Sequence, residues 1–157
     1  MGIFDLFRFT PPPEKKFGLF ISNYIKKDQH ILESYGAIIE SGCVEELKLN
    51  FELYSKNFKA IQIQMLLTCM KVSLNKEDYE NFYSALIKEV KEYDNDILTL
   101  VNEKYSDAYA SNGIEGMIEE LNKKPFKQKL NNHIKQELVF GMEIIKNQFN
   151  EAIKYFS

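Results

Sequence analysis

The sequence is poor in the residues and runs that mark several classes of protein. It has only two cysteines and no tryptophan in 157 residues, and no stretch reaches the roughly 18 uninterrupted apolar residues of a membrane-spanning helix. A glycine-rich phosphate-binding loop is also missing. We therefore expect neither a disulfide scaffold, nor a transmembrane protein, nor a nucleotide-binding loop.

The two cysteines are not expected to pair. Cys43 and Cys69 fall on the same expected helix, 26 positions apart, and at 1.5 Å per residue that separation is about 39 Å. A disulfide needs Cα atoms within about 7 Å. Cys69 lies among apolar neighbours and is expected to be a small core residue. The N-terminus shows no positive region ahead of an apolar one, so we expect a cytoplasmic protein.

Charge and composition are those of an ordinary folded domain. Twenty lysines and arginines against 23 acidic residues give a net charge of −3. No overall positive potential attracts a phosphate backbone, so nucleic acid is not expected as a partner. With 45% apolar residues in a chain of this length, a single domain can bury its own core, and disorder is not expected outside the ends.

A ladder of mostly apolar residues at alternating spacings of three and four predicts a long helix. Its members are Val44, Leu47, Phe51, Tyr54, Phe58, Ile61, Met65, Thr68 and Val72. This spacing places them on one stripe that faces other helices. Residues 60–74 are apolar on nearly every side, so Leu66, Leu67 and Met70 are expected in the core. Residues 47–53 also alternate as a strand would, but no turn residues bracket them.

Glycine, asparagine and proline divide the chain into four long helices and one short helix. The expected ranges are 14–41, 43–74, 75–109, a short helix after 111–113, and a last helix from 125. The last helix has the stripe Phe126, Leu130, Ile134, Leu138, Ile145, Phe149, Ile153 and Phe156. Short connections favour antiparallel neighbours. We therefore expect an all-α fold, an elongated up-and-down bundle that forms one domain over residues 14–157.

Local signals mark the ends of the later helices. Asn75 with Asp78, and Asn112 with Glu115, resemble capping boxes that begin helices. The acidic run 94–96 could interrupt the third helix, although its apolar period continues to Tyr109. The short helix is expected to turn Ile114, Met117, Ile118 and Leu121 inward.

Residues 1–13 form a segment of their own. Five apolar residues among the first nine precede three consecutive prolines, which favour polyproline II and prevent a continuing helix. This apolar arm either folds back on the core or docks on a membrane surface or another chain. Leu6 stands where a myristoylation signal requires serine or threonine, so that modification is not expected.

The residues that usually carry chemistry do not form a motif. Neither His30 nor His133 has a glutamate three positions before it, as a bundle di-iron site would need. His30 with Glu33, and His133 with Glu137, could each share a helix face. Such pairs are more often ordinary surface residues. We therefore expect no cofactor and no metal.

Three functions remain open at this level. The first is a non-catalytic cytoplasmic module that binds another protein, as an adaptor or as an inhibitor that sequesters a toxin or an enzyme. The second is a helical-bundle enzyme whose site is assembled from scattered carboxylates and histidines. The third is a peripheral membrane protein anchored by its N-terminal arm. We favour the first, since no catalytic motif is present.

The expected partner-binding region surrounds the break at residues 111–113. Its residues are Tyr105, Tyr109, Glu115, Glu119 and Glu120. Tyrosine is enriched in protein interfaces, although an acidic run can also be a solvated helix face. Gly113 and Gly116 begin the short helix, and glycine costs about 1 kcal/mol relative to alanine inside a helix. We therefore expect this helix to be held less firmly than its neighbours.

Overall fold

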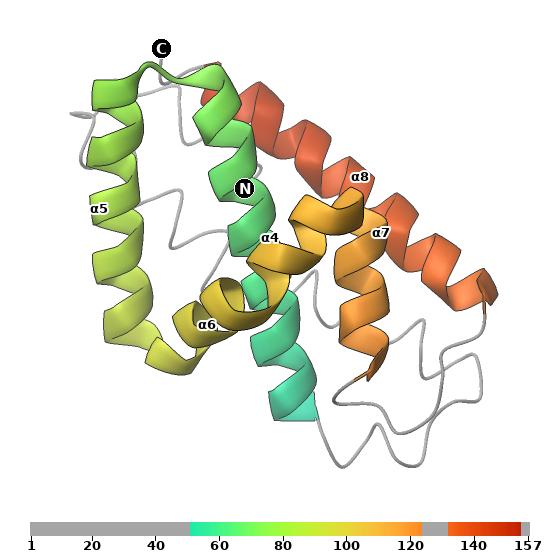
Figure 1. Cartoon of the computed structure of the whole chain (residues 1–157). Coiled ribbons are helices and arrows are strands. Elements are labelled where there is room, and N and C mark those ends of the chain that lie inside the picture. Colours follow the sequence, from blue (N-terminus) through green and yellow to red (C-terminus); the bar gives the residue numbers. More distant parts are fainter. Residues whose placement is uncertain (1–50, 124–131, 155–157) are drawn as a thin grey trace, which may run out of the picture.

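The computed structural model describes residues 51–123 and 132–154, and every regular element in these ranges is helical (Figure 1). This confirms the all-α class. The elements are α4 (Phe51–Ser73), α5 (Lys76–Tyr93), α6 (Asn95–Leu100), the π-helical segment η2 (Val101–Tyr105), α7 (Ser106–Lys123) and α8 (Asn132–Ile153). No helix within these ranges has the length and apolarity needed to cross a membrane.

Helix α4 is the centre of the described fold. It contacts α5, α6, η2, α7 and α8. Helix α5 runs alongside α4, and α8 extends from near the C-terminal end of α4 toward α7 (Figure 1). The bundle of four long helices is not confirmed. The expected first helix and the N-terminal arm lie outside the described residues, as does the start of the last helix.

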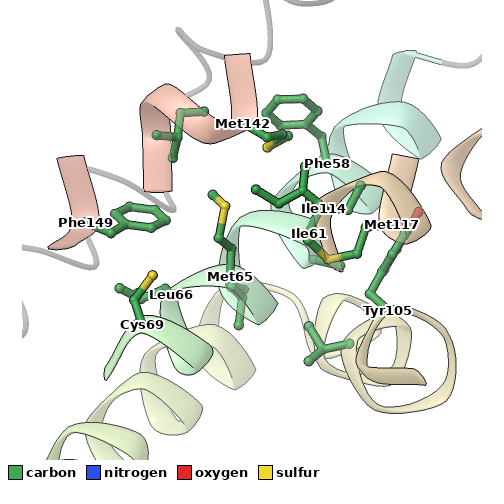
Figure 2. Close-up of a cluster of buried hydrophobic side chains, with 14 of the residues drawn as sticks. Phe58, Ile61, Met65, Leu66, Cys69, Tyr105, Ile114, Met117, Met142 and Phe149 are labelled. Carbon is green, nitrogen blue, oxygen red and sulfur yellow. The ribbon is translucent and has the colours of Figure 1, made fainter. Parts of the chain in front are cut away.

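Most of the α4 ladder is buried, as its periodicity predicts. Tyr54, Phe58, Ile61 and Met65 are in the core, where Phe58, Ile61 and Met65 lie among side chains from α7 and α8 (Figure 2). Val72, in contrast, is 83% exposed. A periodic pattern defines which face of a helix is apolar but not how far along the helix its neighbours extend.

The other core predictions have mixed outcomes. Leu66, Met70 and Cys69 are buried as expected, whereas Leu67 is only partly buried and packs at the edge of the core. The predicted inward residues of the last two helices are all buried where described: Ile114, Met117, Ile118, Leu121, Ile134, Leu138, Ile145, Phe149 and Ile153. Residues 51–53 are helical, so the part of the strand alternative that can be tested is wrong.

The expected third helix is not continuous. Helix α5 begins at the predicted cap, where the Asp78 backbone N–H donates to Asn75 Oδ1 at 2.9 Å. It ends at Tyr93, and Asp94 has an extended backbone with φ −165° and ψ 107°. The Asp94 carboxylate then accepts from the Asp96 N–H at 3.0 Å and begins α6. The acidic run is thus a helix start, because aspartate favours caps over helix interiors.

Lys56 of α4 holds this corner in place. Its Nζ lies 3.2 Å from carboxylate oxygens of both Asp94 and Asp96. Hydrogen bonds to Asp96 and then Asp94 raise the pKa of Lys56. The α5–α6 corner is therefore tied to the central helix by one cation between two carboxylates.

The break in α7 is confirmed at the predicted residues. Asn112 leaves the helical region with φ −154° and ψ 33°, and Gly113 has φ 56° and ψ −140°. Gly116 packs against the first half of α7, where an added Cβ would lie 2.2 Å from the Ala108 carbonyl oxygen. Gly113 thus permits the bend and Gly116 permits a close backbone contact. That the short helix is held less firmly than its neighbours stays a prediction.

Candidate functional site

The five residues expected to contact a partner do not form one surface. Tyr105 is fully buried, and Tyr109 is half-buried in a groove between α4, α5 and α7. Glu115 and Glu119 line a second groove, between α7 and α8. Glu120 accepts from Lys123 Nζ at 3.0 Å. Along α7, the bend at Gly113 lies between Tyr109 and the three acidic residues.

Tyr105 belongs to a buried polar cluster. Its hydroxyl donates to Asn57 Oδ1 at 2.6 Å, and Lys104 Nζ donates to the same oxygen at 3.0 Å. The Asn57 amide in turn donates to the Leu53 carbonyl at 2.8 Å. These bonds join η2 to α4 within the core. In this conformation Tyr105 has no surface with which to contact a partner, which corrects that part of the prediction.

Burial makes Tyr105 sensitive to alkaline pH. Burial first, and then the negative charge of Glu120, raise the pKa of Tyr105 far above its usual value. In the unfolded chain a tyrosine ionises near pH 10. Above that pH the unfolded state holds fewer protons than the folded state, so stability falls as pH rises.

We expect Tyr105 to contribute a loss of about 1.4 kcal/mol in unfolding free energy per pH unit above about pH 10. Urea unfolding between pH 9 and about pH 11.5 measures this slope. Tyr105→Phe should remove that contribution and should cost about 1 kcal/mol at pH 7 through the lost hydrogen bond. Equal slopes in the two proteins would contradict this assignment.

The α7–α8 groove combines apolar and acidic side chains. Its volume is about 410 Å³, and its lining is Glu115, Ile118, Glu119, Asn132, Lys135, Gln136, Val139, Phe140 and Glu143. Phe140 is 69% exposed, and Ile144, one turn further along α8, is 44% exposed. Large apolar side chains exposed together beside a groove are typical of interaction sites.

The carboxylates of this groove lack partners within the described ranges. Glu115, Glu119 and Glu143 form no ion pair with any residue described in the structure. Among the described residues of the lining, only Lys135 adds a positive charge. Glu115 and Glu119 are four residues apart on one helix, and like charges at this spacing destabilise a helix. The described lining therefore places three carboxylates and one lysine beside its apolar residues.

The groove that contains Tyr109, which we name the tyrosine groove, lies between α4, α5, η2 and α7. Its volume is about 370 Å³. Its aromatic walls are Tyr79 and Tyr83 of α5 and Tyr109 of α7. The remaining lining is Gln64, Leu67, Thr68, Lys71, Val72, Ile87, Leu98, Val101, Asn102, Ser106 and Ala110. The described part of the groove thus has aromatic walls, several polar groups and one charged residue.

The candidate ligating and nucleophilic residues do not converge. His133 Nε2 lies 3.2 Å from Glu137 Oε1 on an exposed face of α8, and no third ligand joins them in the described ranges. His30 and Glu33 lie outside these ranges. Cys69 is buried, and this burial raises the pKa of its thiol, so the nucleophilic thiolate is disfavoured.

The sequence reasoning missed the residues that shape both grooves. Phe140 and Ile144 lie off the apolar stripe of α8, and a large apolar residue on the polar side of an amphipathic helix was the available signal. Tyr79 and Tyr83 fall within the expected third helix, residues 75–109, and their spacing is that of an ordinary helical period. Their shared groove with Tyr109 depends on the corner at Asp94, which the sequence left open.

Comparison with known proteins adds no relative: no family model, curated protein or solved structure matches this chain.

Proposed function

We propose that this chain is a non-catalytic cytoplasmic protein-binding module, an adaptor or an inhibitor that sequesters a toxin or an enzyme. Its contact surface is the α7–α8 groove, which includes the predicted residues Glu115 and Glu119. The observation that carries the proposal is the exposure of Phe140 beside carboxylates that have no partner among the described residues.

Phe140 supplies the apolar part of such a contact. Moving a phenylalanine side chain from water into a packed interface stabilises a complex by about 1.5–3 kcal/mol. Aromatic residues near the centre of an interface commonly dominate its affinity. The surrounding carboxylates then select partners by charge and speed their encounter. A partner with positively charged residues around an apolar side chain fits this surface.

The enzyme alternative has less support in the described residues. The described residues that line the two grooves include no histidine and no cysteine, and these residues are frequent general bases and nucleophiles. The membrane alternative depends on the N-terminal arm, which lies outside the described ranges. We therefore develop only the protein-binding proposal.

The test is a quantitative affinity capture from the native host, with mass spectrometry of the retained proteins. We expect the double variant Phe140→Ser with Glu119→Lys to lower the affinity for the dominant partner at least about tenfold. This corresponds to a loss of about 1.4 kcal/mol or more in binding free energy. The reason is that one substitution removes the apolar contact and the other reverses a nearby charge.

A matched control carries the same kinds of substitution on other elements. Leu53→Ser with Glu92→Lys changes a partly exposed apolar side chain and an exposed carboxylate outside both grooves. This variant should retain the partner at the wild-type level, with both proteins folded by circular dichroism. Equal retention by both double variants, or turnover of a substrate by the purified protein, would contradict the proposal.

A further inference from the structure

We propose that the tyrosine groove binds a small carboxylate with a planar apolar body, a role separate from protein binding at the α7–α8 groove. Four properties of the described part of the tyrosine groove support this: its size, its aromatic walls, hydroxyl donors that no other described residue occupies, and one lysine as the charged residue of the described lining.

Size and shape suit a small molecule. The volume of about 370 Å³ falls in the range of about 300–1,000 Å³ that is typical of ligand sites. Tyr79 and Tyr83 stack with ring centroids 6.0 Å apart and planes 28° from parallel, and Tyr109 adds a third ring from α7. Aromatic rings prefer offset-stacked or edge-to-face neighbours, so these walls favour a flat apolar ligand.

The walls also offer hydrogen-bond donors. The hydroxyls of Tyr79, Tyr83 and Tyr109 make no hydrogen bond to any other residue of the described structure. Burial, and then the neighbouring Tyr83, raise the pKa of Tyr79, so its hydroxyl stays protonated at neutral pH. By contrast, Thr68 and Gln64 are already bonded to each other. The free hydroxyls can donate to the oxygens of an anion.

The charge of the groove differs in sign from that of the chain. The whole sequence has a net charge of −3, yet among the described residues that line this groove Lys71 is the only charged one and none is a carboxylate. Lys71 forms no ion pair with another described residue. A ligand carboxylate would therefore find a cation and phenolic donors, with no competing acidic side chain among the described residues of the lining.

The backbone of one wall is irregular in a way that accompanies function in other proteins. Val101 and Asn102 belong to the π-helical segment η2, and Ser106 follows it directly. π-Helical turns are rare in proteins, and those that occur often lie at functional sites. Here the segment joins α6 to α7 and so contributes directly to the wall of the groove.

The probes are naphthalene-2-carboxylate and its neutral isostere naphthalene-2-carboxamide, titrated into the full chain by calorimetry and amide NMR. We expect the carboxylate to bind with a Kd of about 1 mM or tighter, as suits a ligand of this size. It should bind about threefold to fivefold more tightly than the amide, the range of an exposed ion pair. Shifts should map to α5, η2 and the first half of α7.

Three variants decide the assignment. Lys71→Gln should abolish the preference for the carboxylate. Tyr83→Ala should lower the affinity for both probes, because it removes one aromatic wall of the groove. Tyr83 is 41% exposed, so its loss spares the core. Lys88→Gln removes an exposed lysine of α5 outside the groove and should change neither affinity. Thermal unfolding confirms that each variant is folded. No saturable binding, shifts confined to the α7–α8 groove, or affinities unchanged in Lys71→Gln and Tyr83→Ala would overturn the proposal.

Discussion

Replacing Leu66 with alanine should lower the free energy of unfolding by about 2–5 kcal/mol. Leu66 is 1% exposed on the central helix, which contacts all the other described helices. Truncation removes buried methyl groups and leaves a cavity that close-packed neighbours fill only partly. Urea unfolding followed by circular dichroism measures the change.

The adjacent residue provides the control. Leu67 is only partly buried and lies in the lining of the tyrosine groove, so Leu67→Ala should cost about 1 kcal/mol. Both substitutions remove the same atoms from the same helix, so their difference isolates burial. A smaller loss for Leu66→Ala than for Leu67→Ala would show that α4 is rotated relative to this structure.

Alanine at Gly116 should destabilise the protein, although alanine is the better helix former. A Cβ at this position would lie 2.2 Å from the Ala108 carbonyl oxygen, a contact that only a backbone shift can relieve. Such overpacking typically costs about 1–3 kcal/mol. The intrinsic gain from glycine to alanine in a helix is at most about 1 kcal/mol, so the steric cost should dominate.

The opposite sign is expected at Gly141. A Cβ built there meets no atom of the described residues within 4 Å, and Gly141 lies inside α8. Gly141→Ala should therefore raise the unfolding free energy by about 0.5–1 kcal/mol. Thermal or urea unfolding of the two variants side by side tests both. Stabilisation by Gly116→Ala would mean that the two halves of α7 do not pack as closely as described.

Periodicity and caps predicted the local structure well. The spacing of Ile114, Met117, Ile118 and Leu121 indicated which face of the short helix is buried, and all four are in the core. The cap at Asn75 depended only on residues three positions apart. These features are local, so the residues that determine them are close in sequence.

The grooves depend on interactions that a single sequence does not show. Tyr105 and Tyr109 are equivalent in an apolar period, yet a bond from Tyr105 to Asn57, 48 positions earlier, places only Tyr105 in the core. The tyrosine groove likewise requires the turn at Asp94 and the ion pairs that Lys56 makes there. Long-range packing determined both outcomes, and helical spacing carries no information about it.

The bend at Gly113 gives α7 a position in both grooves. Its first half supplies Tyr109 to the tyrosine groove, and its second half supplies Glu115 and Glu119 to the α7–α8 groove. Occupants of the two grooves would therefore share one helix and be subject to thermodynamic reciprocity. Whatever factor a bound carboxylate imposes on the affinity for a protein partner, that partner imposes the same factor on the affinity for the carboxylate.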